Sequence, residues 1–246
     1  MSSLPQRRRV ILMRHGAVQY FDPASQQPLP AHSVPLTPEG WAQARTAGLA
    51  LAAAGIQVDL AIASGLPRTV QTAQGVLAAQ ASPPELQTWP EWEEARGGRL
   101  RDLPPAALDA EFTALQRGPL TEDTRFLGGE RLGELLDRVL PAWDRLRALP
   151  GWHTALVVAH GVVNAALLSH VVSGGQRMVL PGWQQNPACL NLIDLGDTQG
   201  DDLLRGANLN PSDWLQRDAR ASTMELLRSD FGQWQTARQG LHRVTP

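Results

Sequence analysis

Lysine is absent from this chain of 246 residues, so its 22 basic side chains other than histidine are all arginines. They are balanced by 24 acidic side chains, which leaves a formal net charge of −2. This balance predicts no general affinity for nucleic acid. The short cluster at residues 7–9 directly precedes an apolar run, so we interpret it as a solvated lead-in to a strand.

Cysteine is almost absent as well, because Cys189 is the only one. A single thiol excludes an internal disulfide framework and a cysteine-rich metal site. Cys189 begins an apolar run that extends to residue 193, which predicts a buried structural thiol rather than a nucleophile.

Long apolar runs are also missing. No stretch approaches the roughly 20 residues that a transmembrane helix needs, and the polar first residues lack the apolar core of a signal peptide. We therefore expect a cytoplasmic protein with no membrane partner. The length and the 43% hydrophobic content are sufficient for one large domain, which we expect over residues 1–246.

Extended and helical patterns alternate along most of the chain, which predicts an α/β fold with a mostly parallel central sheet in a three-layer α/β/α arrangement. The predicted strands cover residues 10–13, 58–63, 85–89, 154–159 and 189–195. The first predicted helix has its body at residues 41–54, with Thr37 as its cap, Pro38 at the first helical position and Gly55 as its stop signal. The other predicted helices cover residues 67–79, 130–149 and 162–173. Residues 90–129, rich in Gly, Pro and charge, predict a small cap insertion with a helix near 105–116. Residues 200–246 form a C-terminal extension without an assigned structure.

Two His-Gly pairs each follow a predicted buried strand. His15-Gly16 follows the first strand and is preceded by Arg14, and His160-Gly161 follows the strand at 154–159. In such sheets ligands bind outside the carboxyl ends of the strands. Glycine permits close backbone approach, arginine matches phosphate oxygens, and histidine serves as nucleophile, base or acid. This combination predicts a site that holds and attacks a phosphoryl group.

Arg68 strengthens this prediction. It lies in the first turn of a predicted helix that follows Ser64 at a strand end. A cation is unfavourable at a helix N-terminus, whereas an anion binds well there, so Arg68 indicates an anionic partner. No Asp or Cys cluster lies near the two histidines, and a His-x-x-x-His pattern is absent, so we expect no metal and no cofactor.

Taken in order, these segments resemble the histidine phosphatase superfamily, which includes the cofactor-dependent phosphoglycerate mutases. The resemblance covers about residues 9–195 and implies a phosphoglycerate mutase-like fold. Its matching segments are Leu12-Met13-Arg14-His15-Gly16, Leu36-Thr37-Pro38-Glu39-Gly40 with Gln43-Ala44, Ser64 with Arg68 and Gln71-Thr72-Ala73, Glu93-Glu94 with Gly98, Gly128-Gly129-Glu130, and Val157-Val158-Ala159-His160-Gly161.

The resemblance implies a role for each residue. His15 would be the nucleophile that forms a phosphohistidine, and Arg14, Arg68 and a protonated His160 would surround the phosphoryl oxygens. Gly16 and Gly161 would complete the phosphate contacts. Because His15 must attack as a neutral imidazole, we expect its other ring nitrogen to bind a backbone carbonyl.

An acid must protonate the leaving oxygen, and the resemblance offers two registers. In the family this acid is a glutamate two residues after a large apolar residue and four before a glycine. Trp92 and Gly98 favour Glu94, and Glu93 with Gly97 is the competing register. The acid needs a raised pKa, which partial burial would provide.

The residues after Gly16 depart from the family pattern. Family members commonly continue Glu-Thr/Ser, with Trp-Asn shortly after, whereas here Ala17 follows and Phe21 occupies the position of the asparagine. The loss of this polar group argues against a mutase, which must reorient a bisphosphate. Phe21 and Trp183, or Trp92, are candidates for the wall of an apolar substrate pocket.

We therefore expect a metal-independent phosphatase that hydrolyses a small-molecule phosphate monoester. Two alternatives remain at this stage: a phosphoglycerate mutase-type phosphotransferase, and a non-catalytic module that binds a phosphorylated ligand. The sequence identifies neither the substrate nor the oligomeric state.

Overall fold

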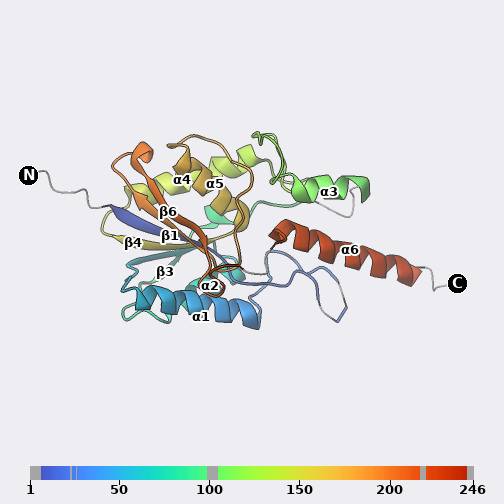
Figure 1. Cartoon of the computed structure of the whole chain (residues 1–246), viewed down its shortest axis with the longest axis horizontal. Helices are drawn as coiled ribbons and strands as arrows, with labels where there is room; N and C mark the ends of the chain where they lie inside the picture. The colour runs from blue at the N-terminus through green and yellow to red at the C-terminus, as the bar shows by residue number, and fades with distance from the viewer. Residues whose placement is uncertain (1–6, 23, 26, 99–104, 217–219, 243–246) are drawn as a thin grey trace, which may run out of the picture.

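The computed structural model describes residues 7–22, 24–25, 27–98, 105–216 and 220–242. Its centre is a six-stranded sheet with the strand order β3-β2-β4-β1-β5-β6 (Figure 1). Strands β3, β2, β4 and β1 are parallel, whereas β5 is antiparallel to β1 and β6 is antiparallel to β5. The expected mostly parallel sheet is confirmed. The strands are β1 (Arg8–Arg14), β2 (Leu60–Ala63), β3 (Leu86–Thr88), β4 (Thr154–Ala159), β5 (Leu190–Leu195) and β6 (Leu203–Leu209).

Helices cover both faces of this sheet, which confirms the expected three layers. Because side chains alternate along a strand, Val10 and Leu12 of β1 pack in one core with α4 and α5, and Ile11 and Met13 pack in a second core with α1 and α2. The helices are α1 (Pro38–Ala53), α2 (Pro67–Leu77), α3 (Pro105–Thr113), α4 (Leu132–Ala148), α5 (Gly161–Val172) and α6 (Thr223–His242), with short 3-10 helices at Pro90–Trp92 and Gln199–Asp201.

The ends of α1 follow from local sequence. Thr37 is the N-cap, and its hydroxyl accepts a hydrogen bond from the Gly40 amide at 3.1 Å, while Pro38 occupies the first helical position. After the helix, Gly55 adopts a φ of +70°, the conformation that glycine adopts most readily. Both features agree with the predicted start and stop of this helix.

The C-terminal extension contains two elements that the sequence left unassigned, the edge strand β6 and the helix α6. Helix α6 packs against α3 beyond the carboxyl ends of the parallel strands (Figure 1). An ion pair of 2.7 Å joins Arg228 of α6 to Asp109 of α3. The extension therefore contacts the cap insertion through α6 and α3. Residues 99–104 of the cap insertion lie outside the described part of the chain. The residues between these elements form an apolar group, called here the cap cluster: Phe21, Leu108, Phe112, Leu127, Phe231 and Trp234.

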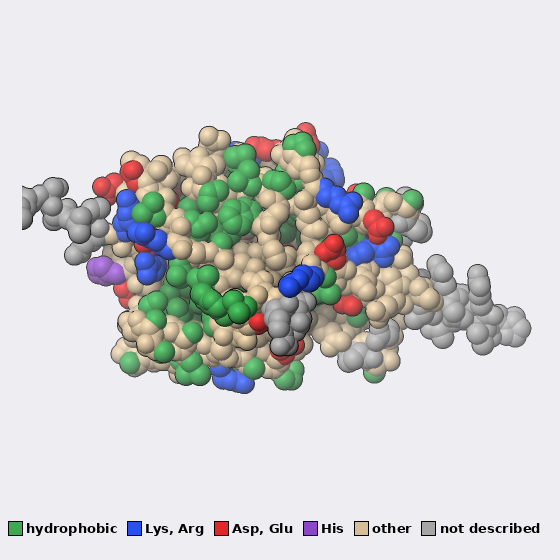
Figure 2. Space-filling model, viewed as in Figure 1, with side chains coloured by type: hydrophobic (Ala, Val, Ile, Leu, Met, Phe, Trp, Pro, Cys, Tyr) green, Lys and Arg blue, Asp and Glu red, His purple; other side chains and the backbone are tan. Residues whose placement is uncertain are grey.

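The surface carries both signs of charge. On the face drawn in Figure 2, acidic and basic side chains are interspersed rather than separated into two halves. Among the helices of the described residues, none is both long and apolar enough to cross a membrane.

Close packing of α1 on α2 gives a first testable prediction. A Cβ at Gly48 would lie 2.5 Å from the carbonyl oxygen of Val76, which is backbone and cannot swing away. Overpacking costs about 1–3 kcal/mol, which exceeds the roughly 1 kcal/mol of helix propensity that alanine gains over glycine. Gly48→Ala should therefore lower the free energy of unfolding by about 1–2 kcal/mol in urea denaturation.

The matched control is Leu49→Ala in the same helix, where the side chain is 64% exposed. This control should stay within about 0.5 kcal/mol of the parent protein. An equal or more stable Gly48→Ala protein would contradict the packing described for α1 and α2.

Candidate active site

His15 lies at the carboxyl end of β1 and is 2% exposed. Its backbone amide donates to the Ala159 carbonyl, and its carbonyl accepts from the Ala188 amide, at 3.1 and 3.0 Å. Its ring Nδ1 lies 2.8 Å from the carbonyl oxygen of Gly16. A carbonyl only accepts, so Nδ1 carries the proton and Nε2 keeps a free lone pair. The expected hydrogen bond from His15 to a backbone carbonyl is confirmed.

Gly16 allows the chain to turn against the start of α1. A Cβ at this position would lie 2.5 Å from the carbonyl oxygen of Gly40, so a side chain does not fit. The Gly16 amide donates to Thr72 Oγ1 at 3.0 Å, and the Thr72 hydroxyl donates to the carbonyl of Arg68 at 2.7 Å. These contacts tie the loop after β1 to the first turns of α1 and α2.

His160 follows β4 and is fully buried at the start of α5. Since β1 and β4 are adjacent and parallel, the two imidazoles meet with their ring centroids 5.2 Å apart. Nε2 of His160 lies 2.8 Å from the Ser64 hydroxyl at the end of β2. Its Nδ1 is buried and has no hydrogen-bond partner among the described residues.

Arg14 and Arg68 lie beside the histidines and are 8% and 2% exposed. Arg14 donates through Nη1 to the Gln185 carbonyl and, at 2.9 Å, to the Thr223 hydroxyl, whereas Arg68 donates to the Ala31 carbonyl at 2.6 Å. Within the described part of the chain, the Nε–H of each arginine is buried without an acceptor. A buried donor without a partner is costly, so the two arginines are arranged for a group that supplies acceptor oxygens.

The pKa values of the two histidines are shifted in the same direction, and burial is the largest cause for both. Burial, together with the charges of Arg14 and Arg68, lowers the pKa of His15 well below its ordinary value. For His160, burial is again the largest cause, followed by His15, Arg68 and Arg14, and the pKa is also lowered well below the ordinary value. In the empty site, desolvation and neighbouring cations therefore disfavour a positive charge on His160, whereas the predicted protonated form belongs to the site that holds a phosphoryl group.

Glu94 brings a carboxyl group to the same place. It follows the 3-10 helix Pro90–Trp92, and both of its carboxylate oxygens lie 3.3 Å from the Val162 amide at the start of α5. A Cβ at Gly161 would lie 3.7 Å from Glu94 Oε2 and 3.9 Å from Arg14 Nε, so this glycine lies between the acid and the cation. Burial raises the pKa of Glu94, and hydrogen bonds from Ala95 and Val162 oppose that shift.

The competing residue Glu93 is used differently. Its backbone carbonyl accepts from Arg138 at 2.6 Å. The sequence alone did not decide which of the two glutamates is the acid. In the structure the carboxylate of Glu94 lies against the start of α5, at the Val162 amide.

The two aromatic residues predicted to contact substrate lie in packed surroundings. Phe21 is 9% exposed and belongs to the cap cluster. Trp183 packs against the core on the α4 and α5 face, and its indole nitrogen donates to Ser169 Oγ at 3.0 Å. Trp92 is buried in that core and donates to the Val139 carbonyl at 3.3 Å.

Sequence reasoning missed two groups that hold Arg14. Thr223 begins α6, in the extension that gave no recognisable pattern, and its hydroxyl is brought to Arg14 only by the fold. Gln185 contributes a backbone carbonyl, which every residue type carries and which no sequence signal reveals.

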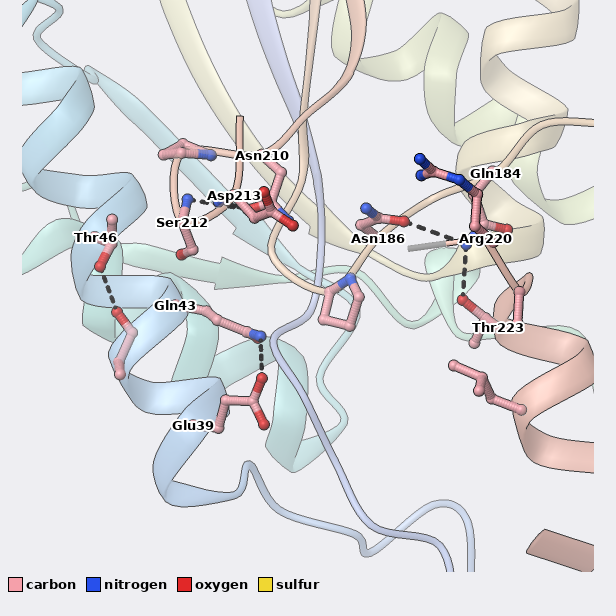
Figure 3. Close-up of a pocket in the computed structure, with 15 residues that line it drawn as sticks. Glu39, Gln43, Thr46, Gln184, Asn186, Asn210, Ser212, Asp213, Arg220 and Thr223 are labelled. Carbon is pink, nitrogen blue, oxygen red and sulfur yellow. Dashed lines mark hydrogen bonds between the residues drawn. The ribbon is translucent and has the colours of Figure 1, made fainter. Parts of the chain in front are cut away.

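A polar cavity of about 660 Å³ lies beside this site (Figure 3). It is lined by α1, the loop around Gln184 and Asn186, the segment after β6, and the start of α6, and the five candidate catalytic residues are not part of its lining. Several of its polar groups bond to one another, including Gln43 to Glu39 at 3.0 Å and Gln184 to Thr223 at 3.2 Å. Thr223 belongs to the cavity lining and its hydroxyl also accepts a hydrogen bond from Arg14 of the site.

Within the described ranges, no group of three or more His, Cys, Asp and Glu side chains is arranged to hold a metal ion. Positive charge at the site is supplied by the guanidiniums of Arg14 and Arg68.

Comparison with known proteins adds family evidence. Residues 10–205 match the model of the Histidine phosphatase superfamily (branch 1). The chain is 32% identical over 166 residues to a protein named "Probable phosphoglycerate mutase GpmB" from Proteus mirabilis (strain HI4320), covering 67% of this chain and 74% of that protein.

Solved structures show the same fold. Alpha-ribazole phosphatase from Shigella flexneri superposes with a TM-score of 0.61 at 22% identity, over 81% of this chain and 96% of that chain. Mycobacterial glucosyl-3-phosphoglycerate phosphatase, in a complex with VO3, superposes with a TM-score of 0.61 at 20% identity, over 82% of this chain and 98% of that chain.

The unpartnered donors predict an anion-dependent gain in stability. Inorganic phosphate at about 100 times its Kd should stabilise the protein by roughly 2.7 kcal/mol, measured as a rise in Tm with phosphate concentration. Arg68→Gln should lose most of this gain, because it removes one of the two buried guanidiniums. Arg45→Gln, which changes an exposed arginine of α1, should keep it. A phosphate-induced shift that is the same in both variants would contradict the anion site.

Proposed function

Because this chain belongs to the histidine phosphatase superfamily, we propose that it hydrolyses a phosphate monoester of a small molecule through a phosphohistidine at His15. The observation that carries the proposal is the convergence of one free imidazole lone pair with buried donors that have no acceptor. The lone pair is on His15, and the donors are on Arg14 and Arg68. A phosphoryl group satisfies these donors while it is attacked.

The first step transfers the phosphoryl group to the enzyme. Nε2 of His15 attacks phosphorus, the bond from phosphorus to the ester oxygen breaks, and the proton of Glu94 passes to the departing oxygen. The raised pKa of Glu94 keeps this proton available. Arg14 and Arg68 neutralise the phosphoryl oxygens, which is the main source of catalysis in such transfers.

The second step releases phosphate. The carboxylate left on Glu94 takes a proton from a water molecule, whose oxygen attacks phosphorus while the bond to His15 Nε2 breaks. The products are inorganic phosphate, a protonated Glu94 and the original imidazole. The positive charge needed by both steps comes from this chain's own side chains, so the proposed reaction is metal-independent and uses no cofactor.

His160 changes its charge during the cycle in this proposal. In the empty site burial, followed by the neighbouring positive charges, lowers the pKa of His160. A bound phosphoryl dianion reverses the sign of the nearest charge and raises the pKa of His160. Its buried Nδ1, which has no partner among the described residues, then donates to a phosphoryl oxygen.

A phosphatase is favoured over a mutase at one residue in particular. Phe21 occupies the position of the polar residue that we associate with family members, and its side chain is committed to the cap cluster. A mutase has to retain a bisphosphate and reorient it, which requires more polar contacts than this segment supplies. In this proposal Phe21 and Trp183 shape the substrate pocket through the segments that they anchor. Rapid phosphate release without an isomerised product is the expected outcome with a phosphoglycerate substrate.

Replacement of the nucleophile is the direct test of the proposed reaction. His15→Ala should abolish turnover of 4-nitrophenyl phosphate and should not become labelled by a radioactive phosphate donor, while its far-UV circular dichroism remains unchanged. The parent protein should keep its activity in EDTA. The control is His153→Ala. The side chain of His153 is 86% exposed, and this residue precedes β4, at the end of the strand opposite to the site.

Residual turnover by a folded His15→Ala protein would disprove the assignment of the nucleophile. A parent protein that neither releases phosphate nor becomes labelled at His15 would favour the alternative of a phospho-ligand binding module.

The acid is tested by the nature of the leaving group. Glu94→Gln should lower kcat for an alkyl phosphate by about 10²- to 10⁴-fold, and much less for 4-nitrophenyl phosphate, because a nitrophenolate leaves without protonation. Burial raises the pKa of Glu94, so the activity on the alkyl phosphate should fall as the pH rises through that pKa. The Glu94→Gln variant should not show this decrease with pH. Glu93→Gln is the matched control, and the same signature in that variant would move the acid to Glu93.

A further inference from the structure

The segment that carries Glu94 is held by Arg138, a side chain that the reaction above does not use. Arg138 projects from α4 and is 16% exposed. Its Nη1 donates to the carbonyls of Glu91 and Glu93 at 2.8 and 2.6 Å, and its Nη2 donates to the carbonyl of Glu94 at 3.2 Å. Three backbone carbonyls of the turn before and at the acid therefore converge on one guanidinium.

Glu130 fixes the same guanidinium from its other side. Its two carboxylate oxygens accept from Nε and Nη2 of Arg138 at 3.0 and 2.9 Å, and this carboxyl group is only 7% exposed. The carboxylate also accepts from the Arg96 amide at 2.9 Å, and the Glu130 amide donates to the Arg96 carbonyl at 2.8 Å. One partly buried ion pair thus holds the backbone on both sides of Glu94.

The geometry requires an arginine in particular. A guanidinium is planar and presents five N–H donors in fixed directions, so it reaches three carbonyls and a carboxylate at once. An ammonium has three donors on one atom and cannot span this set. The held turn directs the Glu94 carboxyl group towards the Val162 amide, two residues after His160. Because proton transfer depends on placement, a displacement of about 1 Å is enough to change a rate by two orders of magnitude.

We propose that Arg138 is a positioning residue for proton donation by Glu94, and that Glu130 holds Arg138 in place for this role. The inference rests on the proposed function, since it assumes that Glu94 protonates the leaving oxygen. It assigns Arg138 no contact with the phosphoryl group.

The test compares two substrates that differ in their need for an acid, β-glycerophosphate and 4-nitrophenyl phosphate. Arg138→Gln should lower kcat for β-glycerophosphate by about 10- to 100-fold, a part of the full contribution of a general acid. With 4-nitrophenyl phosphate the loss should stay within about three-fold, because that step needs little proton transfer. KM should change little for either substrate. Arg138→Lys, which keeps the charge but fewer of the contacts, should fall between the parent protein and Arg138→Gln.

Arg145→Gln is the matched control. Arg145 lies on the same helix and binds the same turn, but it does so through the side chain of Glu91 at 2.8 Å and on the solvent side. This variant should leave the kcat ratio of the two substrates unchanged. A purely structural role of Arg138 would lower Tm without changing that ratio, so the ratio separates the two roles.

A double variant makes the test specific for the acid. In the Glu94→Gln background, Arg138→Gln should cause no further change in the kcat ratio, because the group that it positions is no longer an acid. If Arg138→Gln slows both substrates equally, or changes neither, the proposal is overturned. If Arg138→Gln does not fold, Arg138→Lys and Glu130→Gln decide in the same way, since either must change the ratio.

The failure of this inference is distinguishable from a failure of the proposed function. If Glu94→Gln itself shows no dependence on the leaving group, the acid is wrongly assigned and the proposed function fails at that residue. If Glu94→Gln shows the dependence and the folded Arg138 and Glu130 variants do not, only the positioning role is refuted.

Discussion

The structure depends on one electrostatic constraint, the burial of two guanidiniums and two imidazoles in one place beside the carboxyl group of Glu94. Buried charges of the same sign are unfavourable unless they are hydrogen-bonded and compensated. The fold supplies backbone carbonyl and hydroxyl oxygens that accept from the two arginines. The compensation is incomplete, because two Nε–H groups remain without acceptors among the described residues. The lowered pKa values of His15 and His160 and the raised pKa of Glu94 have a common origin in this desolvated site. A phosphoryl dianion relieves the constraint, which links the stability of the site to its proposed chemistry.

The sheet explains why this arrangement is possible and why much of it was predictable. The sequence placed His15 and His160 at the carboxyl ends of two strands, which parallel strands bring to the same edge of the sheet. The two side chains meet because β1 and β4 are neighbours, and only the structure shows this strand order. Arg68 was predictable for a similar reason, since its position in the first turn of α2 follows from Pro67 and the preceding strand. These predictions rest on periodicity and on turn residues, which act locally. The lowered pKa of His160 in the empty site could not be read from the sequence, because it depends on burial and on the cations that the fold assembles around it.

The C-terminal extension and the supports of the site were not predictable, and the reasons are physical. Strand β6 contains Gly206 and Asn208, pairs with β5 through an irregular register, and gives no clear alternation. Phe231 and Trp234 of α6 are buried in the cap cluster with Leu108 and Phe112 of α3, so their spacing can be interpreted only when both helices are known. In the sequence Arg138 resembles any charged residue on an amphipathic helix, because three of its four partners are backbone carbonyls. Supports of this kind become visible only when the backbone path is known.

The central claim is that hydrolysis proceeds by two displacements at phosphorus, with His15 as the first acceptor. Its most direct test is the stereochemical course of hydrolysis, measured with a phosphate ester whose phosphorus is made chiral by sulfur and oxygen isotopes and whose product is formed in isotopically labelled water. Each in-line displacement inverts the configuration, so a phosphohistidine intermediate predicts net retention. Net inversion would show that water attacks the ester directly, and it would contradict the account of the buried imidazole as a nucleophile.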